Sequence, residues 1–323
     1  MRRLAAALAA VCLAAPATAE PQPTPPPRTP ASVLSAAAPG DWAPIDPSDL
    51  LVMELAGGGR VVIQLADAFA PAHVANIRAL ARTHWYDGLA IERVQDDYVV
   101  QWGDPDGKKP LPAGLTRPAP AEYTRAAAGI PLEPLPFPDT YADRVGLWRS
   151  FPVAESGAEA WLAHCYGMVG VGRDANPDTG TGAELYAVIG QPPRALDRNI
   201  AVVGRVIEGM PLLAALPRGQ GDLGFYANPA DRIAIRSIRL GDDLPPAERP
   251  RFEALSVGSP AFRAWIEVKA NRQDTFFLRP AAALDVCNAM PPIRPIRGDA
   301  SLGPPRPASA PSRSGRRAPA RGR

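Results

Sequence analysis

The stretch Leu89-Ala-Ile-Glu-Arg-Val-Gln-Asp-Asp-Tyr-Val-Val-Gln-Trp-Gly-Asp104 predicts two short strands joined by a tight turn. β-branched and aromatic residues, which favour strands, lie on both sides of a pair of aspartates, which favour turns. This hairpin places Arg93 and Gln101 on neighbouring strands. A long cation and an amide that reach into one cleft beside the apolar Tyr98 and Val99 are suited to hold a peptide and polarise its backbone.

A second hairpin and a helix are expected immediately before this stretch. Residues 51–55 and 60–65 read as strands around the turn Gly57-Gly58-Gly59, and apolar residues alternate with others along the second strand. Residues 72–84 carry apolar side chains at helical spacing, and Pro71 suits the first turn of a helix.

The ends of the chain differ in composition from its middle. Residues 1–19 combine a basic start, an apolar run and an Ala-x-Ala site, which predicts a cleaved signal peptide and a periplasmic location. The apolar run is too short to span a membrane as a helix. Residues 20–47 are rich in Pro, Ala and Thr and predict a disordered linker, while residues 298–323 predict a basic disordered tail.

The charge of the chain is unevenly distributed. The formal net charge is +2, but the signal carries two Arg and the tail six Arg against one Asp, which leaves −5 for residues 20–297. A mildly acidic body does not indicate a nucleic-acid surface. Cys165 and Cys287 would remain in a compartment that permits disulfides. The sequence leaves open whether they are bonded to each other or are two separate buried thiols.

Motifs for other chemistries are missing from the sequence. His73, His84 and His164 lack the spacing of metal ligands, so no zinc site is expected. The chain has no Gly-x-Ser-x-Gly, no phosphate loop and no Cys-x-x-Cys, and the glycines at 170 and 172 are followed by turn residues and not by a helix start. We therefore expect no metal and no cofactor.

The opening hairpin resembles the active-site hairpin of the cyclophilins, whose pattern is Phe-His-Arg-Val, a short turn, then Phe-Met-x-Gln-Gly-Gly-Asp. Two further segments carry the resemblance. The family's pattern Leu-x-x-Asp-x-x-x-Pro-x-x-Val-x-Asn-Phe-x-x-Leu matches in part, and so does Leu-Asp-Gly-x-His-Val-Val-Phe-Gly-x-Val-x-x-Gly-Met. The matching positions here are Asp67, Pro71, Val74, Asn76, Leu80, Leu196, Asp197, Val202, Gly204, Val206, Gly209 and Met210, and Val203 stands where the family has Phe.

This resemblance implies a mainly β fold, a closed antiparallel barrel capped by helices, over residues 48–243. Residues 105–165 form a longer connection than is usual in the family, rich in Pro and interrupted by aromatic residues. We expect a covering loop there, with a short helix around residues 155–163. Residues 244–297 are too apolar for a tail and are expected to pack back on the barrel as a C-terminal extension.

Cyclophilins are peptidyl-prolyl isomerases, so the resemblance implies that activity and assigns residues to it. Arg93 matches the catalytic arginine, and Gln101 matches the glutamine that orients the peptide. The substrate-binding positions that keep an apolar residue are Tyr98, Val99, Tyr186 and Leu196, where the family has Phe, Met, Phe and Leu.

Other positions depart from the family pattern, including the substrate-binding positions Ile200 and Glu184. Ala195 replaces the common Trp, Ile200 the common His, Gly172-Arg173 the common Ala-Asn, and Glu184 the common Gln. These changes remove donors that grip a peptide backbone, which predicts weak or narrow activity. The added carboxylate of Glu184 is expected either to pair with Arg93 or to hold it in place.

The expected partners are proline-containing, unfolded or newly exported polypeptides. An enzyme that speeds cis-trans isomerisation is the first hypothesis, and a binding or chaperone module with little catalysis is the second. The intact Arg93 and Gln101 favour the enzyme, whereas Gly172, Glu184 and Ile200 favour the binder. A scaffold that holds partners through its acidic body and basic tail is a third hypothesis.

Overall fold

The structure is a computed structural model that describes residues 28–104, 106–191 and 193–296. The signal peptide expected at 1–19 and the basic tail expected at 298–323 lie outside the described residues. Within the described ranges, no helix has the length and apolar character needed to cross a membrane.

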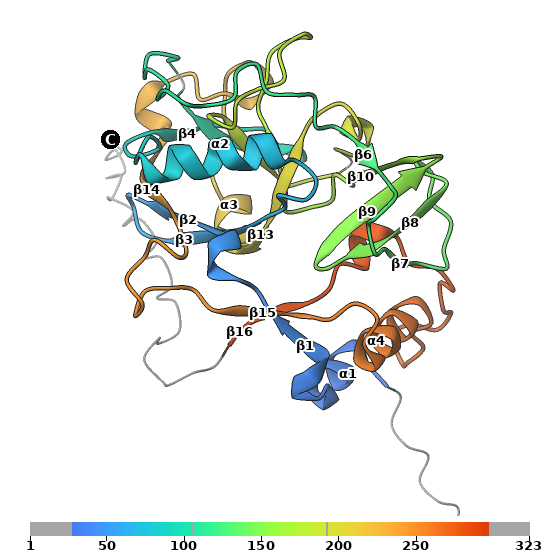
Figure 1. Ribbon diagram of the computed structural model, residues 1–323. Coiled ribbons are helices and arrows are strands. Elements are labelled where there is room, and N and C mark those ends of the chain that lie inside the picture. The colour runs from blue at the N-terminus through green and yellow to red at the C-terminus, as the bar shows by residue number, and fades with distance from the viewer. Residues whose placement is uncertain (1–27, 105, 192, 297–323) are drawn as a thin grey trace, which may run out of the picture.

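A closed barrel of eight strands is the centre of the molecule, as the sequence predicts (Figure 1). The paired strands are antiparallel, and their order around the barrel is β11-β12-β5-β4-β14-β2-β3-β13. The strands are β2 Leu50–Leu55, β3 Arg60–Leu65, β4 Ala90–Val94, β5 Val99–Gly103, β11 Met168–Val171, β12 Leu185–Val188, β13 Val202–Glu208 and β14 Ile233–Leu240.

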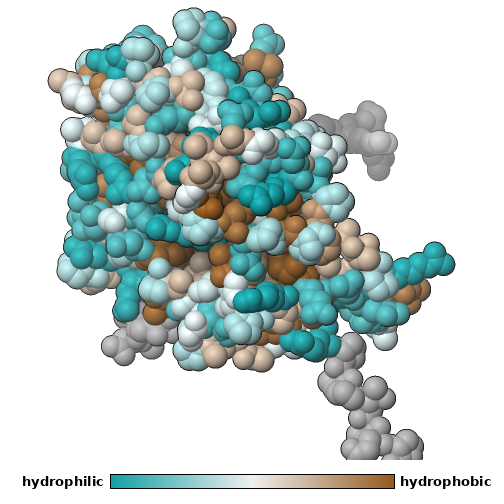
Figure 2. All heavy atoms as spheres, turned by 45° about the vertical axis from the view of Figure 1, so that its right-hand side comes forward, coloured by the Kyte–Doolittle hydropathy of each residue, from teal (hydrophilic) through white to brown (hydrophobic). Residues whose placement is uncertain are grey.

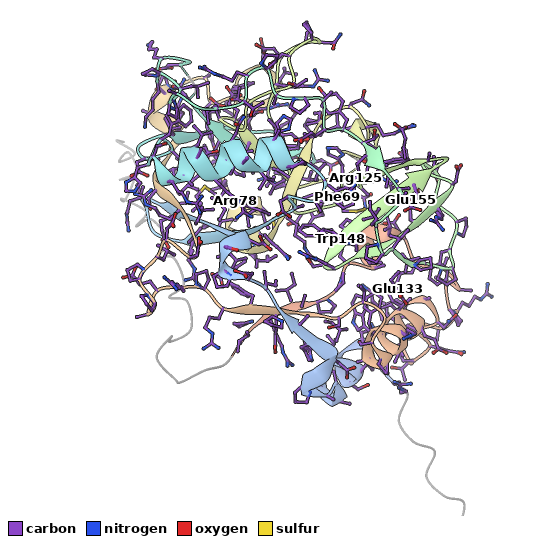
Figure 3. All side chains as sticks on the ribbon, in the orientation of Figure 1. Phe69, Arg78, Arg125, Glu133, Trp148 and Glu155 are labelled. Atoms are coloured by element: carbon purple, nitrogen blue, oxygen red, sulfur yellow. A yellow bond between two sulfur atoms is a disulfide. The ribbon has the colours of Figure 1, made fainter. Side chains whose placement is uncertain are left out.

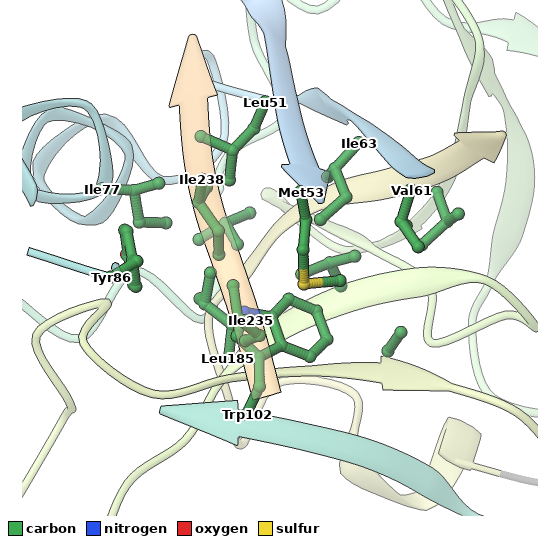
Figure 4. Close-up of a cluster of buried hydrophobic side chains, with 14 of the residues drawn as sticks. Leu51, Met53, Val61, Ile63, Ile77, Tyr86, Trp102, Leu185, Ile235 and Ile238 are labelled. Atoms are coloured by element: carbon green, nitrogen blue, oxygen red, sulfur yellow. The ribbon is translucent and has the colours of Figure 1, made fainter. Parts of the chain in front are cut away.

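Alternation along the strands fills the barrel. On β3, Val61 and Ile63 point into the barrel core, and on β5 the indole of Trp102 lies among Met53 and Ile235 (Figure 4). The outward residues of β3 are buried as well, because Val62 packs against the C-terminal part of the chain. The expected alternation is therefore confirmed, but both faces of this strand are covered.

Helix α2 Pro71–Arg82 closes the barrel on one side, and α3 Met210–Ala214 contributes Leu213 to the same core. Pro71 occupies the first turn, as expected. No side chain of the preceding residue caps α2; instead the carboxylate of Glu122 accepts from the backbone N–H of Ala72 at 2.8 Å and of His73 at 3.0 Å. Short 3-10 turns lie elsewhere: η1 Pro39–Asp41, η2 Pro47–Asp49, η3 Pro193–Leu196, η4 Asp222–Gly224, η5 Pro229–Asp231 and η6 Val286–Asn288.

The long connection after β5 contains a second sheet and not a covering loop. Its five strands are ordered β6-β10-β9-β8-β7. They are β6 Arg125–Ala126, β7 Glu133–Pro134, β8 Arg144–Trp148, β9 Phe151–Ser156 and β10 Glu159–Leu162. The helix expected at 155–163 is wrong, because residues 151–162 form a hairpin whose turn contains Gly157 at φ 58°. Phe151 and Val153 on β9 and Trp161 on β10 are residue types that favour strands.

The expected disordered linker at 20–47 is wrong for its described part, residues 28–47. Helix α1 Pro30–Ala36 packs against α4 Pro260–Ala270, and strand β1 Trp42–Pro44 pairs with β15 Phe252–Leu255. Strand β16 Ile293–Pro295 completes this three-stranded sheet. Order arises here because the Pro- and Ala-rich segment finds its partners more than 200 residues away in sequence.

The two ends and the connection share one hydrophobic core beside the barrel. It contains Trp42, Phe151, Trp161 and Phe262, and also Phe69 from the loop after β3. Figure 3 shows Phe69 and Trp148 together; their rings meet edge to face at 5.4 Å, and Arg125 lies 5.7 Å from the Phe69 ring. The C-terminal extension thus packs back as expected, but much of its contact is with the inserted sheet and the N-terminal segment.

A disulfide joins Cys165, just after β10, to Cys287 in η6. Of the two possibilities that the sequence left open, the bonded pair is the one formed. Figure 2 shows the face on which the inserted sheet comes forward; hydrophobic residues gather in a band across its middle, with hydrophilic ones around them.

Candidate active site

The β4–β5 hairpin presents Arg93 and Gln101 side by side, as the sequence predicts. Arg93 lies opposite Gln101 in the β4–β5 pairing. The register shifts between Ile91, which faces the core, and Arg93, which faces outward. Because Val100 and Trp102 face the barrel core, Gln101 between them faces outward. Both functional candidates therefore lie on the outer face of the barrel.

The guanidinium of Arg93 is fixed by oxygen atoms without charge. One Nη donates to Oε1 of Gln101 at 3.0 Å, Nε donates to the carbonyl of Leu223 at 2.7 Å, and the other Nη donates to the side chain of Gln95. The group also lies 5.6 Å from the ring centre of Tyr98 and 5.4 Å from that of Phe225. Half burial of the cation lowers the pKa of Arg93.

Glu184 holds Gln101 and does not pair with Arg93. Nε2 of Gln101 donates to Oε2 of Glu184 at 3.0 Å, so the amide turns its oxygen toward Arg93. Of the two expected roles for this carboxylate, the structure shows the holding role, exerted through Gln101. Burial raises the pKa of Glu184, and nearby acidic groups add to the rise even though Gln101 opposes it.

Apolar side chains lie next to the hydrogen-bonded series Arg93, Gln101 and Glu184. We call the group formed by Val99, Tyr186, Val188, Tyr98 and Ile200 the outer apolar cluster. Tyr186 is opposite Gln101 in the β5–β12 pairing, and Val188 is opposite Val99. Four of the substrate-binding candidates therefore meet on one face, together with Val188, which sequence reasoning did not select.

Leu196 is placed differently from the other candidates. It ends η3, is half-buried, and is not part of the outer apolar cluster. The neighbouring Arg194 and Asp197 are buried instead.

A buried polar chain lies behind Tyr186. Its hydroxyl is 3.0 Å from Nε2 of His164, whose Nδ1 is 3.0 Å from Oδ1 of Asp197. Asp197 also accepts from Trp161 in β10 at 3.0 Å and from Arg194 at 2.6 Å. Burial alone would raise the pKa of Asp197, but the hydrogen bond from His164 and the charge of Arg194 together lower it.

The same hydroxyl explains a glycine on the neighbouring strand. A Cβ atom at Gly170 would lie 2.3 Å from the Tyr186 oxygen, so β11 can approach only because position 170 has no side chain. Burial raises the pKa of Tyr186, which keeps the phenol neutral.

Glu92 is an acidic group at the site that sequence reasoning missed. It is 4% exposed, and its carboxyl has no hydrogen-bond partner among the residues that the structure describes. Burial, and after it repulsion from Glu184, raises the pKa of Glu92 to about 7. A signal was present, because Glu92 stands where the family pattern Phe-His-Arg-Val has His.

Gln95, Leu223 and Phe225 were also missed as contacts of Arg93. Gln95 lies in the opening hairpin itself, but the other two are about 130 residues from Arg93 in sequence. Leu223 has φ 55°, which few side chains adopt, and Phe225 is 38% exposed. In the described ranges, no cluster of three or more His, Cys, Asp or Glu residues has the arrangement to hold a metal ion.

The chain is similar to known proteins over this same region. Residues 50–240 match the family described as cyclophilin type peptidyl-prolyl cis-trans isomerase/CLD. A probable peptidyl-prolyl cis-trans isomerase of Brucella suis is 27% identical over 197 residues, which cover 60% of this chain and 84% of the relative. The corresponding protein of Brucella abortus is 26% identical over the same length and coverage.

Among solved structures, cyclophilin AquaCyp293 from Hirschia baltica superposes with a TM-score of 0.62 at 22% identity. The match covers 85% of this chain and 100% of that one, so the likeness in fold extends beyond the barrel into the added segments. The family match spans the barrel with both strands that carry Arg93 and Gln101. The chain therefore belongs to the cyclophilin-type peptidyl-prolyl cis-trans isomerases.

Proposed function

We propose that this isomerase twists the peptide bond before proline by placing the guanidinium of Arg93 over the prolyl nitrogen while the proline ring rests on the outer apolar cluster. Rotation about this bond has a barrier of about 18 to 20 kcal/mol because amide resonance must be broken. The nitrogen becomes pyramidal and basic as resonance is lost. A donor aimed at that nitrogen therefore stabilises the twisted state more than the planar one.

The observation that carries the proposal is the way Arg93 is held. A guanidinium has five N–H donors, and three of them are occupied by Gln101, Gln95 and Leu223. The rest can serve a substrate from a fixed position. Because all three acceptors are uncharged, the positive charge is not neutralised by a carboxylate before substrate arrives.

Arg93→Ala tests this role in an assay of cis-trans exchange of Xaa-Pro peptides. We expect kcat/KM to fall by about 10²- to 10³-fold, the usual effect of losing one such donor. Arg93→Lys is the matched variant: it keeps the charge but cannot form the three fixed hydrogen bonds, so we expect an intermediate rate. Equal rates in the wild type and in Arg93→Ala would reject the role of Arg93.

We also propose that the protein acts after export, in the periplasm, on unfolded or newly exported polypeptides that contain proline. The signal-like residues 1–19 support this location, and so does the Cys165–Cys287 disulfide, since such bonds persist in oxidising compartments. N-terminal sequencing of the mature protein and fractionation of cells test the location. A chain that keeps Met1 and stays with the cytoplasmic fraction would contradict it.

Binding without catalysis is the second candidate. It is favoured by Glu184, which replaces a glutamine donor with an acceptor, and by Gly172, which has no side chain to contact a peptide. In that case proline peptides would bind the wild type and Arg93→Ala equally, and neither would accelerate exchange.

A further inference from the structure

We propose that Glu184 makes this isomerase selective for substrates with a lysine or arginine immediately before the proline. The inference rests on the proposed placement of proline on the outer apolar cluster. It adds a substrate class that follows from the charges around Gln101 and not from the isomerisation chemistry.

The position of Glu184 along the strands is the first step. Val188 lies opposite Val99 and Tyr186 opposite Gln101, so the apolar cluster occupies one end of the β5–β12 pair. Glu184 lies past the other end: a Cβ built at Gly103 would meet its Cγ at 2.6 Å. Gly103 is two residues beyond Gln101 on β5. Because each residue of a strand advances by about 3.3 Å, Glu184 lies about 7 Å further along the strand than Gln101.

The direction of the substrate is the second step. A prolyl nitrogen has three substituents, of which Cα and Cδ belong to the ring and the third is the carbonyl carbon of the preceding residue. With the ring on the apolar cluster and the nitrogen under Arg93, the preceding residue points away from the cluster. It therefore extends past Gln101 toward Glu184.

The unused hydrogen-bond acceptor of Glu184 is the third step. Oε2 accepts from Gln101, but Oε1 has no partner among the residues that the structure describes. Glu184 packs against the backbone of Gly172, where a Cβ would lie 2.9 Å from Cβ of Glu184, but its side chain is only half-buried. A donor from a bound peptide can reach this oxygen.

Glu92 is a second acidic group that favours a cation at this place. The residue is 4% exposed, and its carboxyl accepts no hydrogen bond from the described part of the chain. It repels Glu184 and Asp104, and the pKa of Glu92 is raised to about 7 by burial and by these neighbours. A positive group placed between the two glutamates would lower both pKa values and satisfy both carboxylates.

Arg232 and Arg93 lower the pKa of Glu92, but burial and the repulsion from Glu184 outweigh them. Asp174, Asp104 and Asp178 add negative potential at Glu184. Arg232 donates to Asp106, and Arg173 donates to the backbone oxygens of Asn199 and Asp174. Arg93 is directed to uncharged acceptors on the other side of Gln101.

The experiment compares three peptides, Ala-Xaa-Pro-Phe with Xaa as lysine, norleucine or glutamate, in an NMR exchange assay without a coupling protease. Norleucine has nearly the shape of lysine without its charge, so the ratio of kcat/KM for lysine over norleucine isolates the charge. We expect an excess on the order of tenfold, which corresponds to about 1.4 kcal/mol. The glutamate peptide should be the slowest, and the lysine excess should shrink as salt is raised.

The variants are judged by the same ratio, which does not depend on how far a substitution lowers the overall rate. Glu184→Gln should bring the ratio close to one, and Glu92→Gln should reduce it. The control Glu208→Gln removes a carboxylate that pairs with Arg60, outside the site, and should keep the wild-type ratio.

Each outcome separates this inference from the proposed function. Exchange of all three peptides at equal kcat/KM by the wild type would overturn the selectivity alone. A lysine excess that survives in Glu184→Gln would overturn the role of Glu184. Failure to accelerate exchange of any peptide would overturn the proposed function, and the inference with it.

Discussion

Replacing Glu92 with glutamine should stabilise the protein at alkaline pH and have much less effect at acidic pH. The carboxyl is buried, without a hydrogen-bond partner in the described ranges, and repelled by Glu184, so its ionised form is unfavourable in the folded state. Glutamine has the shape of the neutral acid and cannot ionise. The substitution therefore removes the pH-dependent cost and leaves the packing unchanged.

The magnitude follows from the pKa. The pKa of Glu92 rises from an ordinary 4.5 to about 7 on folding, and each unit corresponds to about 1.4 kcal/mol. Below pH 4.5 the acid is neutral in both states and its favourable contribution is fully present. Between 4.5 and 7 the unfolded chain loses the proton first, so stability falls as pH rises, by about 3 kcal/mol in total.

Urea denaturation of wild type and Glu92→Gln at pH 5 and pH 8 measures this difference. We expect the variant to gain about 2 to 2.5 kcal/mol more at pH 8 than at pH 5, since part of the change is complete below pH 5. Glu248→Gln changes the same charge at an exposed position and serves as the control. An equal effect of Glu92→Gln at the two pH values would refute the reasoning about this buried acid.

Three further predictions concern contacts that hold the added segments and the site. Replacing Cys287 with serine removes the disulfide that closes a loop of 122 residues to Cys165. On the chain-entropy model this should lower the free energy of unfolding by about 4 to 5 kcal/mol. In urea denaturation the reduced wild type should match the Cys287→Ser variant, and an unchanged midpoint would contradict the prediction. Tyr186→Phe leaves Nε2 of His164 without its partner and should cost about 1 to 3 kcal/mol in the same assay; no loss would mean that the hydroxyl contact is dispensable. Glu122→Gln should lower the thermal midpoint by the equivalent of about 1 kcal/mol, because the charge at the start of α2 is lost; an unshifted melting curve would argue against that cap.

The core of the site could be predicted because it is local in sequence. Arg93 and Gln101 are eight residues apart on one hairpin, and strand alternation places both on the same face. The apolar positions Tyr98 and Val99 lie within the same hairpin. Tyr186 required the resemblance to the family, because nothing in its own neighbourhood shows that it pairs opposite Gln101.

The parts that were wrong or missed depend on contacts that are distant in sequence. Residues 28–47 have a composition typical of linkers, yet β1 is ordered by pairing with β15 at the other end of the chain. The carbonyl of Leu223 accepts from Arg93, although the two residues are 130 positions apart in sequence. A backbone oxygen leaves no signature in a sequence. The sequence position of His164 bears only on metal ligation, whereas its partners are an aspartate and a tyrosine brought together by folding.

The added sheet and the active site depend on each other through the hydroxyl of Tyr186. A phenylalanine, as in the family pattern, would need no partner there, but a buried hydroxyl does. His164 supplies that partner, and Asp197 fixes the imidazole while accepting from Trp161 in β10. Tyrosine at 186 is therefore favourable only in a chain whose insertion delivers His164 and Trp161 to this place. Removing the insertion should leave a polar group unsatisfied beneath the surface on which we place the proline ring, so the barrel of this protein cannot be reduced to the family's minimal domain without a change at 186.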